Sequence, residues 1–150
     1  METWREKLVE DRAGAQRILR DASRIAVIGM KPESRAEQPA HYVPAYLKEA
    51  GYEVVPVPCY YPEVRDMLGI PVCRTLAQVD GPVDLVVVFR RPHDIPPHVD
   101  DIIGKRPAAV WFQSGIRNEA AAERLARAGI EVVQDRCTMV EHRMMVARSR

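Results

Sequence analysis

Cysteine is scarce in this sequence, and the few cysteines are placed in a way that argues against metal or redox chemistry. The 150 residues contain three cysteines, an odd number, and none belongs to a CxxC pair. They are Cys59, Cys73 and Cys137. Zinc sites and redox couples usually place two cysteines close together in the chain, so we expect no metal ion. The thiols are interpreted as small buried side chains in a reducing compartment.

Long apolar runs and a large net charge are also absent. No stretch approaches the roughly 18 apolar residues that a membrane span requires. The N-terminal METWREKLVEDR lacks the apolar core of a signal peptide. These features predict a cytoplasmic location and no membrane partner. The net charge of +1 supplies no overall field that would attract nucleic acid.

The composition provides enough apolar material for one compact domain. Hydrophobic residues make up 47% of the chain and charged residues 29%, which is ordinary for globular proteins. The length lies at the upper end of the commonest domain size, about 100–150 residues. We therefore expect residues 1–150 to form a single domain.

Five short apolar runs, rich in β-branched residues, predict strands. They are Ile25–Ile28, Val54–Val57, Leu85–Phe89, Ala108–Phe112 and a weaker run, Ile130–Val133. Because apolar residues follow one another without polar alternation, both faces of each strand should be covered, as in a parallel sheet.

Helical patterns separate most of these runs. We expect helices at residues 4–21, 44–50, 95–103 and 120–128, with Asn118 capping the last and a glycine ending each of the last three. The alternation predicts an α/β fold, a doubly wound, Rossmann-like parallel sheet of about five strands with three α/β/α layers. The segment CYYPEVRDMLGIPVCRTL is the least regular part.

Basic residues follow several of the predicted strands. They are Lys31 and Arg35 after the first strand, Arg90 and Arg91 after the third, and Arg136 after the fifth. Ligands of open α/β sheets bind beyond the carboxyl ends of the strands, so we expect these side chains to gather at one edge. A helix N-terminus with added cations suits phosphate groups. The loop in RIAVIGMKPESR therefore predicts a phosphate site, although a solvated turn would have the same residues.

A dinucleotide, the usual ligand of such a fold, does not suit this sequence. The G-x-G-x-x-G fingerprint needs a second glycine close to the pyrophosphate, and Lys31 occupies that position. An NAD site also has an acidic residue after the second strand, where this chain has Pro58 and Cys59. Both departures argue against an NAD-dependent oxidoreductase.

Several segments resemble a known family. The order IAVIG, HYVPAYLKEAGYEVVPVP, VDLVVVFRRP and AVWFQSGIRNEAAAERLARAGIEVVQDRC is similar to that of the stand-alone CoA-binding proteins. These are small Rossmann-type domains related to the N-terminal CoA-binding domain of the succinyl-CoA synthetase α subunit. The resemblance covers residues 24–142.

The resemblance implies a site for coenzyme A or an acyl-CoA at the carboxyl edge of the sheet. The first loop would hold the diphosphate, and the end of the second strand would lie against the adenosine. The FRR segment would flank the phosphates, and QSG would line the path of the pantetheine arm. The candidate cofactor-binding residues are then Gly29, Met30, Lys31, Ser34, Arg35, Tyr42, Val57, Pro58, Phe89, Arg90, Arg91, Gln113, Ser114 and Gly115.

No catalytic constellation is evident in the sequence. The four histidines are far apart, and Ser114 lacks the G-x-S-x-G elbow of hydrolases. Cys137 could form a mixed disulfide with CoA or accept an acyl group, since the neighbouring Arg136 favours the thiolate. Non-catalytic binding of CoA or acyl-CoA, an enzyme acting on acyl-CoA or a nucleotide cofactor, and a structural protein without a ligand all stay open. A homo-oligomer, formed through a helix at residues 4–21, is also open.

Overall fold

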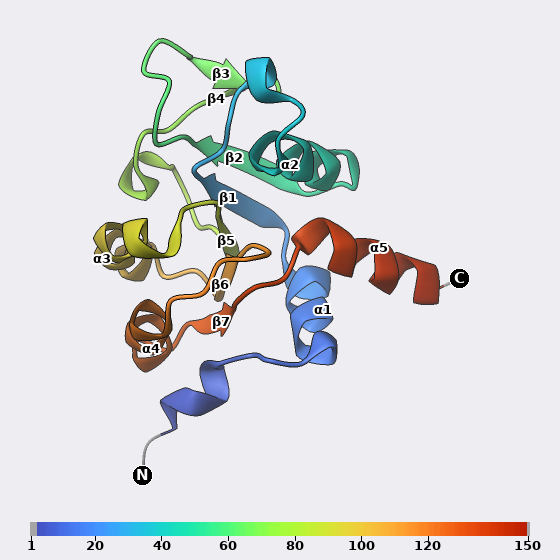
Figure 1. The fold of residues 1–150 in the computed structure, drawn as a ribbon, viewed down its shortest axis with the longest axis vertical. Coiled ribbons are helices and arrows are strands. Elements are labelled where there is room, and N and C mark those ends of the chain that lie inside the picture. Colours follow the sequence, from blue (N-terminus) through green and yellow to red (C-terminus); the bar gives the residue numbers. More distant parts are fainter. Residues whose placement is uncertain (1–2, 150) are drawn as a thin grey trace.

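The computed structural model describes residues 3–149 and has a central sheet of five parallel strands (Figure 1). The strands are β1 (Arg24–Ile28), β2 (Glu53–Val57), β5 (Leu85–Val88), β6 (Ala109–Phe112) and β7 (Glu131–Val133). Their order across the sheet is β2-β1-β5-β6-β7, and all neighbours are parallel. The doubly wound, Rossmann-like α/β fold expected from the sequence is confirmed.

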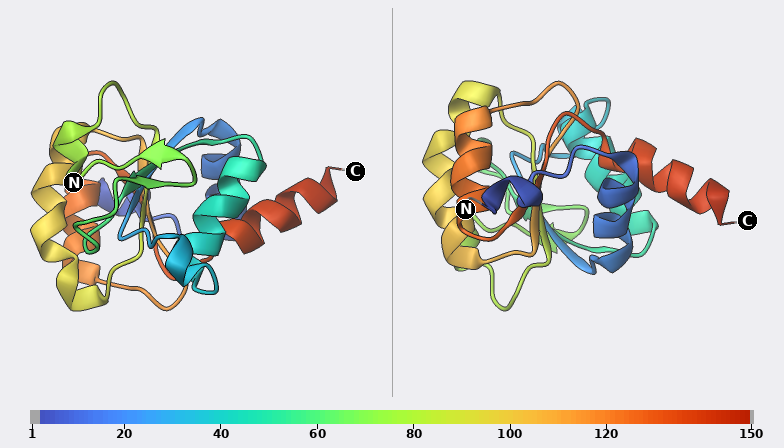
Figure 2. Two further views of the ribbon diagram at one scale, coloured as in Figure 1. Left: turned by 90° about the horizontal axis from the view of Figure 1, so that it is seen from above. Right: turned by 90° about the horizontal axis from the view of Figure 1, so that it is seen from below.

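Helices cover both faces of this sheet (Figures 1 and 2). On one face lie α1 (Arg12–Asp21), α2 (Pro39–Glu49) and α5 (Thr138–Arg148), and on the other α3 (Pro96–Lys105) and α4 (Glu119–Arg127). The strand residues alternate between the two layers, so that Ala26 and Ile28 join the core under α3 and α4, while Ile25 and Val27 join the other core. Burial on both sides explains why the strands read as continuous apolar runs.

The two central strands lie where the winding of the chain reverses. After β1 the chain crosses through α2 to β2, and after β5 it crosses through α3, on the opposite face, to β6. Because β1 and β5 are neighbours, the two connections diverge at the carboxyl ends of these strands. A crevice at this reversal point is the usual ligand position of the fold.

The prediction of one helix over residues 4–21 is wrong in its first half. A short 3-10 helix, η1 (Trp4–Lys7), is followed by an extended segment in which Leu8 bridges Val132 of β7. The Val9 N–H donates to the Val132 carbonyl at 2.9 Å. This pairing protects the edge strand β7 and delays α1 until Arg12. The inner face of α1 is buried, and the helix packs against α5.

Two other helix boundaries differ from expectation. Helix α2 begins at Pro39, five residues before the proline at position 44 that appeared to start it. Proline suits a first helical position because its missing N–H has no partner there. Helix α3 continues through Gly104 and ends at Lys105, and the C-cap Arg106 adopts the left-handed conformation with φ 56°. The cap of α4 is confirmed, since the Asn118 side chain accepts from the Ala121 N–H at 3.0 Å.

The irregular segment and the C-terminus contain structure that the sequence patterns missed. A hairpin of β3 (Asp66–Met67) and β4 (Ile70–Pro71), followed by the 3-10 helix η3 (Leu76–Gln78), fills the irregular segment. Helix α5 projects from the body of the molecule (Figure 2). Across residues 3–149, no helix has both the length and the hydrophobicity needed to cross a membrane.

Candidate functional site

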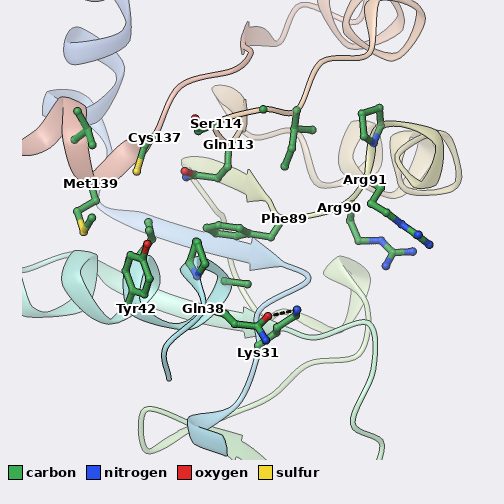
Figure 3. A pocket seen from close by; sticks show the side chains of 17 residues that line it. Lys31, Gln38, Tyr42, Phe89, Arg90, Arg91, Gln113, Ser114, Cys137 and Met139 are labelled. Atoms are coloured by element: carbon green, nitrogen blue, oxygen red, sulfur yellow. Dashed lines mark hydrogen bonds between the residues drawn. The ribbon is translucent and has the colours of Figure 1, made fainter. Parts of the chain in front are cut away.

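A cleft of about 730 Å³ opens at the carboxyl ends of the central strands (Figure 3). Its lining comes from the segments that follow β1, β5 and β6, from α2, and from the start of α5. Eight of the candidate residues line it: Lys31, Tyr42, Phe89, Arg90, Arg91, Gln113, Ser114 and Gly115. The cleft thus lies at the reversal point of the sheet.

The other six candidate residues do not line this cleft. Gly29 lies next to Phe89 and Arg90 of the lining, and the side chains of Met30, Val57 and Pro58 are buried in the protein interior. Ser34 and Arg35 belong to the exposed 3-10 helix η2 (Glu33–Arg35). A hydrogen bond to the Tyr61 side chain raises the pKa of Arg35.

Two of the five basic residues expected at this edge, Arg35 and Arg136, do not line the cleft. Arg136 turns away from the cleft and donates to the Glu10 carbonyl at 2.8 Å. It also pairs with the buried Glu141 carboxylate at 3.4 Å. The cations that line the cleft are those of Lys31, Arg90 and Arg91.

Gly29 allows the ends of β1 and β5 to approach each other closely. Its φ is 82°, and a Cβ at this position would lie 2.3 Å from the Phe89 carbonyl oxygen. The Gly29 N–H donates to Val57 and the Phe89 N–H donates to Ile28, both at 2.9 Å. Any side chain at position 29 would force the ends of β1 and β5 apart. Because these strands are neighbours, Lys31 after β1 and Arg90 after β5 lie close together.

A proline inside α2 helps to hold the loop after β1. Pro44 has no N–H, so the carbonyl of Ala40, four residues earlier, lacks its usual helical partner. The Lys31 N–H donates to that carbonyl at 3.1 Å. The Lys31 carbonyl in turn accepts from Nδ1 of the buried His41 at 2.9 Å. Both backbone groups of Lys31 are thus fixed by α2, which gives His41 a structural role.

One end of the cleft carries the excess positive charge. Arg90 donates to the Tyr60 hydroxyl at 3.3 Å, and its buried Nε has no hydrogen-bond partner. Arg91 is 72% exposed and pairs with Asp94 at 3.1 Å. Although desolvation opposes it, the hydrogen bond from Arg91 and the nearby positive charges keep the pKa of Asp94 below its ordinary value. Lys31 donates to the Gln38 side chain.

The lining of the cleft therefore contributes three positive charges, and one carboxylate, Asp94, lies next to them. This excess of positive charge suits a polyanion.

The Gln113 side chain belongs to the framework of the cleft. Its Nε2 donates to Thr138 Oγ1 at 2.7 Å, and its Oε1 accepts from the Thr138 N–H at 3.3 Å. Both residues are buried. Because an amide at the end of β6 satisfies the first N–H of α5, Gln113 fixes the position of that helix. The next residue, Ser114, is exposed, and the Gly115 N–H donates to Asp135 at 2.6 Å.

Helix α5 supplies the wall that sequence reasoning missed. Cys137, Met139 and Val140 line the cleft opposite Tyr42 and other residues of α2. Met139 and Met145 pack against the core, and Met139 also faces the cleft (Figure 3). The segment lacks a clear apolar stripe, so its helical state left no strong signal.

Metal ligation has no support in residues 3–149, where no group of three His, Cys, Asp or Glu side chains could hold an ion. Cys59 and His98 lie 4.0 Å apart, Sγ to Nε2, near the end of β2. Burial raises the pKa of the Cys59 thiol and lowers that of His98. Both groups are therefore held in their neutral forms, which is unfavourable for a thiolate nucleophile.

Comparison with known proteins identifies the family. A family model described as CoA binding domain matches residues 23–143. The uncharacterized protein YneT of Bacillus subtilis (strain 168) is 34% identical over 131 residues, which cover 87% of this chain and 93% of YneT. YneT is described as uncharacterized, so this match says nothing of a ligand or an activity.

Solved structures agree with this assignment. The structure of cell-free ID.343 from Thermus thermophilus is 39% identical with a TM-score of 0.81, and the match covers 90% of this chain and 98% of that one. A hypothetical protein from Pyrococcus horikoshii OT3 is 29% identical with a TM-score of 0.81, over 91% of this chain and 92% of that one. Because the family model spans most of the sequence and the fold agrees, this chain belongs to the family of stand-alone CoA-binding proteins.

Proposed function

We propose that this protein binds coenzyme A or an acyl-CoA in the cleft, without catalysing a reaction. The observation that carries the proposal is the convergence of Lys31, Arg90 and Arg91 at one end of the cleft, with Asp94 as the counter-charge. This end lies at the reversal point of the sheet. Membership of the CoA-binding family supports the same ligand.

The geometry favours coenzyme A over NAD. Residues Val57 and Pro58 at the end of β2 are buried and carry no carboxylate for ribose hydroxyls. Coenzyme A has a 3′-phosphate in addition to its diphosphate, so it can use more cations than NAD. Arg91, with 72% of its side chain exposed, is free to turn toward such a phosphate.

The absence of a reaction is proposed from the state of the candidate nucleophiles. Cys59 and His98 are held neutral by burial, and neither lines the cleft. Ser114 has no histidine among its hydrogen-bond partners in the described part of the chain. Among the described residues that line the cleft, the Cys137 thiol is therefore the remaining candidate for an attacking group.

Titration calorimetry with the purified protein tests the proposal. CoA should bind at micromolar concentration, and NAD should release no heat. Arg91→Ala should weaken CoA roughly tenfold, the loss of one charge-assisted contact, and should weaken dephospho-CoA less. Arg124→Ala, which removes an exposed arginine paired with Asp100 on the far side of the sheet, is the matched control. Binding of NAD without CoA would refute the proposal, and equal losses for both ligands would remove the assignment of Arg91.

A second candidate function, an enzyme acting on acyl-CoA, is favoured by one observation. Cys137 lines the cleft close to Met139 (Figure 3), where an acyl group could reach its thiol. Release of free CoA from acetyl-CoA, followed with a thiol reagent, tests this candidate. Turnover that disappears in Cys137→Ser would support an enzyme over a carrier.

A further inference from the structure

The two ends of the cleft differ in chemistry. Figure 3 shows Arg90 and Arg91 at one end, with Met139, Tyr42 and Cys137 at the other. At this second end, apolar side chains come from two helices that face each other across the cleft. Tyr42 and Val43 belong to α2, and Met139 and Val140 belong to α5.

Large apolar side chains are left partly open to solvent on both of these walls. Tyr42 is 41% exposed and Val140 is 43% exposed, and both line the cleft. The cost of leaving apolar surface in water is recovered when a ligand covers it. Because the apolar end is continuous with the cationic end in one cleft, the same ligand should carry phosphates at one end and an apolar group at the other.

A neighbouring hollow does not offer an alternative site for a charged acyl group. It shares Ser114, Cys137 and Val140 with the cleft. Its arginines already pair with acids: Arg12 with Glu141 at 3.0 Å, Arg136 with Glu141 at 3.4 Å, and Arg117 with Glu10 at 3.4 Å and with Glu119 at 3.0 Å. A carboxylate at the end of an acyl chain would compete with these pairs, so the hollow disfavours dicarboxylic acyl groups.

We infer that the ligand is an acyl-CoA whose acyl chain is apolar and lies between Tyr42 of α2 and Met139 and Val140 of α5. The inference rests on the proposed function, because the cations must hold the phosphates of the same molecule. The pantetheine arm then crosses the cleft past Phe89 and Ser114. The chain length of the acyl group determines the affinity.

Calorimetry with free CoA, acetyl-CoA, butyryl-CoA, hexanoyl-CoA and succinyl-CoA tests the inference. Each buried methylene should strengthen binding about fourfold, so butyryl-CoA should bind roughly fifteenfold more tightly than acetyl-CoA. Succinyl-CoA should bind more weakly than butyryl-CoA. Equal affinity across the series, or tighter binding of succinyl-CoA, would overturn the inference while leaving CoA binding intact. If free CoA and all of the thioesters fail to bind, the proposed function itself fails.

Two variants of α5 locate the acyl chain. Val140→Asn makes the apolar end polar without adding charge, and should abolish most of the chain-length dependence. Val146→Asn is the matched control, because Val146 is 37% exposed on the same helix and does not line the cleft. Thermal unfolding of both variants verifies that they fold. An unchanged chain-length dependence in Val140→Asn would contradict the assigned position of the acyl chain.

Discussion

Replacing Gly29 with alanine should destabilise the fold and weaken ligand binding together, because this glycine lies where the ends of β1 and β5 meet. Its φ of 82° belongs to the left-handed region, and its missing Cβ leaves space for the Phe89 carbonyl oxygen. The residue that follows Phe89 is Arg90, which carries one of the cations of the cleft. A side chain at position 29 would push the Phe89 carbonyl away and would therefore also move Arg90 in the cleft.

Two costs add in this variant. An alanine in the left-handed region costs about 1–2 kcal/mol. The new Cβ would lie 2.3 Å from the Phe89 oxygen, whereas ordinary contacts begin at 3.4 Å, so the two strand ends must separate. The separation strains the hydrogen bonds from Gly29 to Val57 and from Phe89 to Ile28, both 2.9 Å long, at a combined cost of about 2 kcal/mol. The total loss is about 3–4 kcal/mol.

Urea denaturation measures the loss, and Gly129→Ala is the control. Gly129 has a similar φ of 86°, but a Cβ there would meet no heavy atom within 4 Å. The control should lose only the conformational cost, about 1–2 kcal/mol, and should bind CoA like the parent protein. If the two variants are destabilised equally, within about 0.5 kcal/mol, the close approach of β1 and β5 does not limit the residue at position 29.

The remaining predictions concern the framework and the thiols. Gln113→Leu leaves the Thr138 N–H and hydroxyl buried without a partner, so it should cost about 2–3 kcal/mol and accelerate hydrogen exchange in α5; unchanged exchange would contradict the role of this amide. Burial lowers the pKa of His142 below its ordinary value of 6.5, so the unfolded chain binds protons more readily, and the melting temperature should fall as the pH drops below about 6.5. His142→Gln should make the melting temperature less dependent on pH. If the melting temperature falls equally with pH in both proteins, His142 is not the group responsible. Bound CoA should protect Cys137 from alkylation, measured by mass spectrometry, but not Cys73, which does not line the cleft.

Much of the fold could be predicted because its signals are local. The run Leu85–Val88 is buried on both faces, and such a run has few alternatives to a central parallel strand. The start of α4 was predictable because Asn118 caps it through a residue three positions away. Helix α2 was placed too late because Pro44, inside the helix, carries a signal that normally marks a beginning. The helical hydrogen bond that Pro44 removes is replaced by one from the Lys31 N–H, which lies outside the helix.

Local patterns in the sequence were enough to predict the class of the fold and the resemblance to CoA-binding proteins, and they pointed to the carboxyl edge of the sheet as the ligand position. Which side chains face the cleft depends on tertiary contacts that these patterns do not contain. Arg136 follows a strand as Arg90 does, yet its side chain pairs with Glu141 and does not line the cleft. The apolar wall of α5 likewise exists because Gln113 fixes the start of that helix. Strand formation depends on neighbours in sequence, whereas the direction of a long charged side chain depends on partners that folding brings from distant parts of the chain.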